Sequence, residues 1–159
     1  MRLAADEMLR GLGRWLRAAG HDTLIAEPGE GDKSLLARSR AEARVLLTRD
    51  RTLAERAGPD GVWLRAVGLD DAARELRERL GLDWRFAPFT RCLVDNAELD
   101  GAGPEASQAL PPRARSLSGP LRRCLACGRL YWPGSHVRRM QARLDVWATR
   151  EDTTPFIAR

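Results

Sequence analysis

The amino-acid sequence contains no apolar run that approaches the roughly 20 residues of a membrane-spanning helix. Asp6, Glu7 and Arg10 interrupt the stretch where a secretory signal peptide would need an apolar segment. Internal repeats and long low-complexity tracts are also absent. A chain of 159 residues can bury one ordinary core and carry a small second module. We therefore expect a cytoplasmic protein that does not associate with membranes.

Cysteine and histidine are scarce, and several nucleotide-binding and hydrolase motifs are missing. The three cysteines, Cys92, Cys124 and Cys127, cannot all pair with one another, and a reducing compartment argues against disulfides. Metal binding is then their leading use. With only His21 and His136 available, the chain offers no plausible Ser/His/Asp set, and it has no Walker loop and no Gly-x-Gly-x-x-Gly.

Lysine is almost absent, so the net charge of +5 comes from arginine. Residues 113 to 143 are rich in arginine and contain no acidic residue. Such a run is usually a solvated surface, but the missing acids favour a polyanionic partner, because the planar guanidinium donates to phosphate in pairs. Arg122 and Arg123 are candidate phosphate contacts within this run.

Short apolar runs alternate with amphipathic stretches over the first eighty residues. The strand candidates are 2–5, 22–26, 44–48 and 62–66, and the helix candidates are 8–19, 33–43, 50–57 and a segment from 70 or 71 to 80. This alternation predicts an α/β fold with a mostly parallel sheet and helices on both faces. Beyond residue 82 the periodicity is lost in a Gly/Pro-rich region.

Acidic residues stand where such a sheet places its chemistry. Asp6 follows the first predicted strand and Asp50 follows the third, and the carboxyl ends of parallel strands share one rim. Asp32, at the head of the second helix, belongs to a loop at the same rim. Carboxylates that converge repel one another unless a cation neutralises them or one of them holds a proton, and Mg²⁺ or Mn²⁺ prefers such oxygen ligands.

Helix capping is the alternative explanation for several of these acids. Asp32, Asp50 and Asp71 each stand at a helix start, where an aspartate accepts backbone hydrogen bonds, and for Asp71 we favour the cap. Asp6 has no such structural need at the end of an apolar strand. Glu7 is better explained as a partner of the helix dipole than as a ligand.

Other uses of strand-end aspartates match less well. A phosphorelay receiver needs a lysine after a later strand, whereas Lys33 lies on the second helix. An aspartyl phosphatase usually needs a second aspartate two residues after the first, where this chain has Met8. Metal-dependent phosphodiester hydrolysis is the best match.

Four segments together resemble the Mut-seven C-terminal RNase domain family, in which a PIN-like nuclease domain is joined to a zinc ribbon. They are residues 6–22, 46–50, 89–92 and 124–136, with Met140 beyond them. The resemblance implies a three-layer α/β/α PIN-like domain over 1–85, a zinc-ribbon-like module with a Gly/Pro-rich insert over 86–142, and a tail over 143–159. It also implies that Asp6, Asp32 and Asp50 bind the metal.

The resulting hypothesis is a ribonuclease that uses two Mg²⁺ or Mn²⁺ ions to hydrolyse RNA, with the ribbon helping to bind the strand. Arg14 and Arg17 on the first helix are further candidate substrate contacts, and solvation is their alternative. A nucleic-acid-binding or regulatory module with a weak or inactive nuclease centre is the main rival, and the toxin of a toxin–antitoxin pair is a third possibility. Convergence of the three aspartates distinguishes the enzyme from the binding module.

The cysteines supply an incomplete zinc-ribbon pattern. Cys124 and Cys127, followed by Gly128, form one Cys-x-x-Cys knuckle. The family pattern starts the second knuckle at Cys92 and closes it with a cysteine three residues later, where this chain has Asp95. The expected zinc ligands are therefore these three thiols with the Asp95 carboxylate. His136 is the alternative fourth ligand, although a hydrogen bond in its loop or a helix cap explains it better, and loss of zinc is the remaining alternative. Tyr131 and Trp132 either pack the ribbon core or stack on bases.

Overall fold

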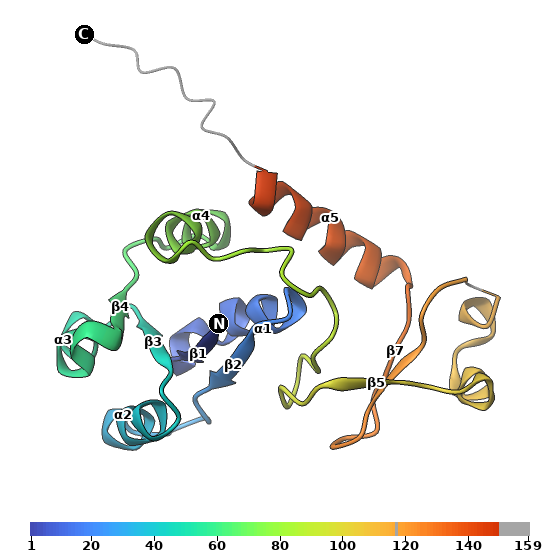
Figure 1. The fold of residues 1–159 in the computed structure, drawn as a ribbon, viewed down its shortest axis with the longest axis horizontal. Helices are drawn as coiled ribbons and strands as arrows, with labels where there is room; N and C mark the ends of the chain where they lie inside the picture. The colour runs from blue at the N-terminus through green and yellow to red at the C-terminus, as the bar shows by residue number, and fades with distance from the viewer. Residues whose placement is uncertain (117, 150–159) are drawn as a thin grey trace, which may run out of the picture.

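A four-stranded parallel sheet forms the centre of the N-terminal part of the protein (Figure 1). The computed structural model describes residues 1–116 and 118–149. Its first elements are β1 (Arg2–Ala5), η1 (Glu7–Leu9), α1 (Arg10–Ala18), β2 (Asp22–Ile25), α2 (Asp32–Ala41), β3 (Val45–Thr48), α3 (Arg51–Ala57), η2 (Gly58–Asp60), β4 (Gly61–Trp63) and α4 (Leu69–Leu80). The strand order is β2-β1-β3-β4. All four predicted strands and all four predicted helices of this region are present.

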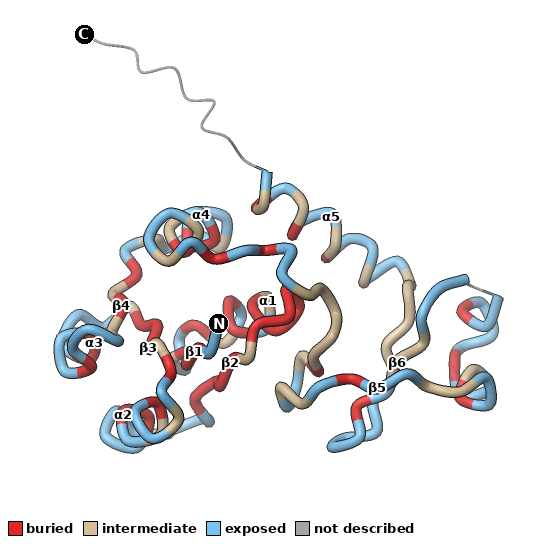
Figure 2. The backbone as a smooth tube through the Cα atoms, viewed as in Figure 1, coloured by how far each residue is buried: buried red, intermediate tan, exposed pale blue. Residues whose placement is uncertain are grey.

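Apolar side chains cover both faces of the sheet, because successive residues of a strand point to opposite sides. Leu3 and Ala5 of β1 belong to one buried cluster with residues of α1 and α4, whereas Ala4 belongs to a second cluster with residues of α2 and α3. The buried positions of the sheet and its helices are red in Figure 2. The predicted fold class, a PIN-like α/β/α domain, is confirmed.

Two glycines allow α1 to pack closely against its surroundings. A Cβ atom on Gly13 would lie 2.7 Å from Cγ1 of Ile25, so glycine permits the helix to approach β2. Gly20 has a φ of 93°, which ends α1 in a conformation that L side chains rarely adopt. A Cβ atom there would also lie 2.2 Å from the carbonyl oxygen of Ala87.

Strand β4 is shorter than the predicted strand 62–66. Leu64 N–H still donates to the carbonyl oxygen of Thr48, at 2.8 Å. The next two amides, of Arg65 and Ala66, instead donate to the carboxylate of Glu75 on α4, at 3.1 and 3.0 Å. The chain therefore leaves the sheet because a side chain replaces its backbone partner.

A second, antiparallel sheet forms the zinc-ribbon-like module. Its strands are β5 (Leu99–Gly101), β6 (Arg122–Cys124) and β7 (Leu130–Tyr131), in the order β5-β6-β7. The Gly/Pro-rich insert between β5 and β6 contains two short 3₁₀ helices, η3 (Pro104–Ala109) and η4 (Pro112–Ala114). This module lies beside β2 and α1 in Figure 1.

The last described element, α5 (Ser135–Thr149), returns from the ribbon to the first domain. Its buried residues Met140, Leu144 and Trp147 join the cluster on the α1 and α4 side of the sheet. The Trp147 ring centroid lies 4.9 Å from that of Trp15 and 4.8 Å from that of Trp84. Residues 143 to 149 were expected to begin a tail, but they continue α5 and are partly buried, because Leu144 and Trp147 pack against the core. The rest of the expected tail, 150 to 159, lies outside the described residues.

Candidate functional site

Asp6 and Asp50 flank the point where the connections of the sheet reverse direction. From β1 the chain passes through α1 on one face to β2, and then through α2 on the other face to β3. The boundary between β1 and β3 is therefore the topological switch point, outside which open α/β sheets bind their ligands. Asp6 directly follows β1, and its N–H donates to the carbonyl oxygen of Leu47 in β3 at 3.0 Å.

Thr48, at the end of β3, connects the two aspartates. Its hydroxyl donates to Oδ2 of Asp6 at 2.6 Å and accepts a hydrogen bond from the N–H of Asp50 at 2.9 Å. The threonine is fully buried, and both hydrogen bonds of this bridge are partly buried. Thr48 is not among the residues predicted from the sequence, although a polar residue that closes an otherwise apolar strand, two positions before Asp50, is a signal for it.

Each of these aspartates also caps a helical turn. Oδ1 of Asp6 accepts from Glu7 N–H at 2.6 Å, and Oδ1 of Asp50 accepts from Leu53 N–H at 3.0 Å. The capping interpretation is thus confirmed for Asp50. It does not exclude metal binding, because a carboxylate has two oxygens with about four lone-pair positions, and these bonds use only part of them.

Asp32 is placed differently from the other two candidates. It is exposed and is the first residue of α2, whose N-cap is Gly31, so Asp32 is not the cap. Its Oδ2 lies 3.4 Å from Nη1 of Arg56 on α3. Within residues 1–116 and 118–149, only one group of three or more potential ligands is close enough to share an ion, and it does not include the three aspartates.

Glu7 and Glu30 hold the loop between β2 and α2. Glu7 lies in the first turn of η1, and its Oε2 accepts from Gly29 N–H at 3.0 Å. Glu30 accepts from Glu27 N–H and pairs with Arg38 at 2.7 Å. These two carboxylates shape the loop before Asp32, so the acidic rim contains structural acids as well as candidate ligands.

The ribbon brings together the four expected zinc ligands. The ligand atoms of Cys92, Asp95, Cys124 and Cys127 all lie within 4.8 Å of one another. Sγ of Cys92 is 3.7 Å from Sγ of Cys127, and Sγ of Cys124 is 3.3 Å from both Asp95 oxygens. A tetrahedral ion with Zn–S bonds of about 2.3 Å requires sulfur atoms roughly 3.8 Å apart. The group could therefore bind a metal such as zinc.

Asp95 occupies the same place in its knuckle that Cys127 occupies in the other. Asn96 N–H donates to the carbonyl oxygen of Cys92 at 3.1 Å, and Gly128 N–H donates to that of Cys124 at 2.8 Å. The residue after each second ligand is left-handed, with φ of 70° at Asn96 and 73° at Gly128. Asparagine tolerates this conformation better than most residues. The substitution in the family pattern thus changes the ligand and keeps the backbone turn.

The charges of the ligand group follow from its close packing. Partial burial raises the pKa of Asp95, but hydrogen bonds from Cys127, the Ala97 N–H and Cys124 outweigh this and lower the pKa to about 2. The same carboxylate raises the pKa of Cys127 to about 12. His136 is exposed in the first turn of α5 and is not part of the group. His136 is therefore not the fourth ligand in this structure.

Comparison with known proteins agrees with this architecture. Residues 1–144 match the family described as the Mut7-C RNAse domain. The chain belongs to this family. No curated protein and no solved structure matches it. Membership in an RNase domain family indicates nuclease activity and suggests RNA as the substrate.

The arginines predicted to contact substrate have different surroundings in this Mut7-C RNAse domain. Arg17 is 5% exposed. Its Nε donates to the carbonyl oxygen of Thr23 at 2.8 Å, and Nη1 donates to those of Leu93 and Val94 at 3.1 and 2.6 Å. Arg17 therefore joins α1 to the ribbon, which corrects its expected role as a substrate contact. Arg14 is exposed on the same helix.

Arg122 and Arg123 lie on β6 of the Mut7-C ribbon. Arg123 is exposed, whereas Arg122 is half-buried in a cavity of about 220 Å³ with Phe89 and Trp132 in its lining. Tyr131, by contrast, packs against the buried Cys92 and Cys124, and its hydroxyl lies 3.1 Å from Cys92 Sγ. Of the two ribbon aromatics, Tyr131 serves the core.

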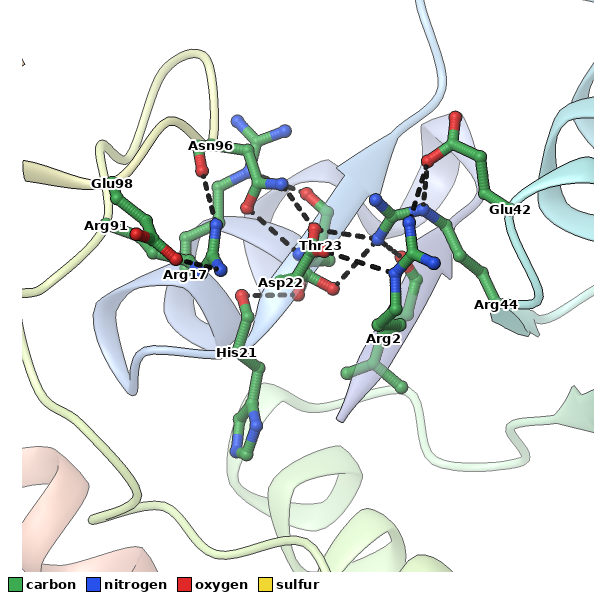
Figure 3. A network of polar contacts seen from close by, with 11 residues as sticks. Arg2, Arg17, His21, Asp22, Thr23, Glu42, Arg44, Arg91, Asn96 and Glu98 are labelled. Atoms are coloured by element: carbon green, nitrogen blue, oxygen red, sulfur yellow. Dashed lines mark hydrogen bonds and ion pairs between the residues drawn. The ribbon is translucent and has the colours of Figure 1, made fainter. Parts of the chain in front are cut away.

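A polar network attaches the ribbon of the Mut7-C domain to the edge strand β2 (Figure 3). Oδ1 of Asp22 accepts from Nη1 of Arg44 at 2.8 Å and from Nδ2 of Asn96 at 2.7 Å. Asn96 in turn accepts from Thr23 N–H through its Oδ1, at 2.9 Å. Partial burial raises the pKa of Asp22, but the bonds from Arg44 and Asn96 outweigh this and lower the pKa to about 2.

No helix of the described residues combines the length and the apolar character that crossing a bilayer requires.

Proposed function

We propose that the protein is a metal-dependent ribonuclease that hydrolyses RNA phosphodiester bonds, with Asp6 and Asp50 holding a divalent ion. The supporting observation is that the two carboxylates end neighbouring strands at the switch point of an RNase-family fold and are joined through Thr48. The oxygen donors suit Mg²⁺ or Mn²⁺. Such ions are commonly bound by one or two carboxylates, several waters and substrate phosphates, so a pair of aspartates suffices.

Each residue of the pair has a defined task in this proposal. Thr48 orients Asp6 through its hydroxyl, and the caps at Glu7 N–H and Leu53 N–H keep the two carboxylates from rotating freely. Bound metal would supply an activated water and stabilise the charge on the scissile phosphate and the leaving oxygen. In the two-ion form, Asp32 would be the third ligand, and its Oδ2 lies beside Arg56. No side chain of the protein acts as a nucleophile.

The ribbon has a supporting role in the proposed enzyme. Zinc held by the three thiols and Asp95 would stabilise this small module, because binding energy in such a site is folding energy. Arg122 and Arg123 would contact the RNA backbone. The thiols need the reducing conditions of the cytoplasm, where we place the protein.

A nucleic-acid-binding module with a weak nuclease centre is the second candidate. It is favoured because Asp6, Asp32 and Asp50 do not form a group that could share an ion among the described residues, and because Asp32 lies beside Arg56. On this proposal Asp6 and Asp50 serve only as helix caps, and the basic surfaces carry the function.

A cleavage assay separates the two proposals. Labelled single-stranded RNA is incubated with Mn²⁺ and with wild-type protein, Asp6→Asn or Asp50→Asn, and the exposed Asp60→Asn serves as a control. The nuclease proposal expects each active-site change to lower the rate by about 100-fold or more, since even residues that only support metal ligands contribute 10- to 100-fold. Melting curves verify folding. No activity in the wild type would favour the binding module, whereas full activity in both Asp6→Asn and Asp50→Asn would refute the assignment of the metal site to these two aspartates.

A further inference from the structure

A basic groove lies along the outer edge of the parallel sheet. Strand β4 pairs with β3 on one side only, and α3 and α4 flank it (Figure 1). The groove has a volume of about 440 Å³, and we call it the Trp63 groove. The side chains in its lining that matter here are Arg51, Glu55, Trp63, Arg65 and Arg79.

The arginines of the Trp63 groove are held in place by the tryptophan. The Cζ atoms of Arg51 and Arg65 lie 5.6 and 5.1 Å from the Trp63 ring centroid, within the range of cation–π attraction. The ring is fixed by its Nε1, which donates to the carbonyl oxygen of Arg49 at 3.2 Å. Both guanidiniums are thereby partly ordered before any ligand arrives, which lowers the entropy cost of binding.

Positive charge in the groove is only partly neutralised. Arg51 pairs with Glu55 at 2.8 Å, and Arg79 pairs with Glu75 at 2.6 Å. Arg65 is exposed and forms no ion pair with any residue that the structure describes. The carboxylate of Glu75 contacts Arg65 through the backbone, where it accepts the N–H groups of Arg65 and Ala66. The Arg65 guanidinium is therefore available to an anion from outside.

The groove opens beside the acidic site. Trp63 is the register partner of Thr48 in the β3–β4 pair, so the two residues stand one strand spacing apart, about 4.8 Å. Arg51 directly follows Asp50 in the sequence. An RNA strand with its scissile phosphate near Asp50 would therefore extend over the Trp63 groove.

We propose that the Trp63 groove binds the phosphodiester backbone of the RNA strand next to the acidic site, with Arg65 as its principal phosphate contact. The inference rests on the proposed function in taking RNA as the ligand. Carboxylates at the rim repel a polyanion, so a nearby cationic surface is needed to hold the strand. Arginine suits this task because its planar fork donates two parallel hydrogen bonds to a phosphate.

Fluorescence anisotropy tests the groove without relying on cleavage. A labelled single-stranded RNA of about 12 nucleotides, within the usual span of such sites, is titrated with full-length protein in buffer without divalent ions. Arg65→Ala removes one proposed phosphate contact. Its matched control is Arg74→Ala, five residues before Arg79 on α4 and about 140° around the helix. Arg74 pairs with Asp71 on the same helix.

One lost phosphate contact on a single strand changes the slope of log affinity against log salt concentration by about 0.7. Relative to 1 M salt, where such a contact contributes nothing, this corresponds to about eightfold weaker binding at 50 mM salt and about fourfold at 150 mM. We expect these changes for Arg65→Ala and wild-type affinity for Arg74→Ala. Arg65→Lys keeps the charge but loses the fork, and we expect a smaller loss from it. Equal affinities of Arg65→Ala and Arg74→Ala would overturn the proposal.

Competition identifies the class of partner. Polyglutamate of the same charge should displace the RNA poorly from the wild type. If polyglutamate displaced the labelled RNA as well as unlabelled RNA does, the groove would instead suit an acidic protein, and the assignment to RNA would fail. The anisotropy titration omits divalent ions, so it measures binding and not cleavage. A wild type that never cleaves RNA in the separate assay with Mn²⁺ would refute the nuclease and leave this binding result to stand or fall by itself.

Discussion

Asp22→Asn tests the network that attaches the ribbon to β2. The carboxylate accepts hydrogen bonds from Arg44 and Asn96, and Arg44 is only 7% exposed. Asparagine has nearly the same shape but removes the negative charge. The buried guanidinium of Arg44 then loses its charged partner at Asp22. Its remaining bonds to Glu42 and to backbone carbonyls compensate for this loss only in part.

The magnitude follows from the pKa of Asp22. The carboxyl has a reference pKa of 3.8, and folding lowers it to about 2. This difference corresponds to about 2 kcal/mol of stability at neutral pH. Because the pKa is lower in the folded state, the contribution is fully present above pH 3.8 and is lost as the pH falls through about 2. The wild type should therefore lose more stability on acidification than Asp22→Asn.

Urea unfolding, followed by tryptophan fluorescence, measures this difference. At pH 7 we expect the midpoint of Asp22→Asn to fall by about 1 M for a slope of about 2 kcal/mol/M. The urea midpoints of the variant and the wild type should approach each other as the pH falls to about 2. Asp60→Asn, at an exposed position in η2, is the matched control and should stay within about 0.5 kcal/mol of the wild type. Equal stability of Asp22→Asn and the wild type at pH 7 would show that the Asp22 carboxylate does not stabilise the fold.

Three further changes probe the ribbon and α5. Asp95→Cys should raise zinc retention against a chelator and raise the melting temperature, since a thiolate is the softer ligand; purified protein without zinc in either form would remove the zinc site. Replacing Arg122 and Arg123 with alanine should flatten the salt slope of RNA binding by about 0.7 per lost contact, and an unchanged slope would return them to the solvated surface. Trp147→Ala should cost about 3–5 kcal/mol in urea unfolding because it empties a buried site, whereas the exposed Val146→Ala should cost less than about 0.5 kcal/mol.

The parallel sheet could be predicted because its signals are local and consistent. Apolar strands of three or four residues alternate with amphipathic helices, and both patterns depend on burial against neighbouring elements. Asp6 and Asp50 could be placed at one rim for the same reason, since the position of a residue after a parallel strand determines the edge where it lies. The knuckle at Cys92 could be predicted only from the family pattern, because Asp95 stands where the second cysteine of a Cys-x-x-Cys spacing would be.

Side-chain partners across the fold were less predictable. Arg17 was expected at the substrate, yet it bonds to carbonyls of Leu93 and Val94, more than seventy residues away. Asp32 was grouped with the other acids by its loop, but the ion pair with Arg56 depends on how α2 and α3 lie side by side. Sequence periodicity indicates which face of an element is buried and does not indicate which polar group meets which.

Anomalous diffraction from crystals grown with Mn²⁺ can show whether Asp6 and Asp50 hold the ion. We expect a manganese peak at roughly 2.1 Å from oxygens of both aspartates, a distance typical of small divalent ions bound by carboxylates. The peak should disappear in Asp6→Asn crystals, while Asp60→Asn crystals keep it. An enzyme that cleaves RNA with Mn²⁺ but binds the ion away from these two aspartates would contradict the account.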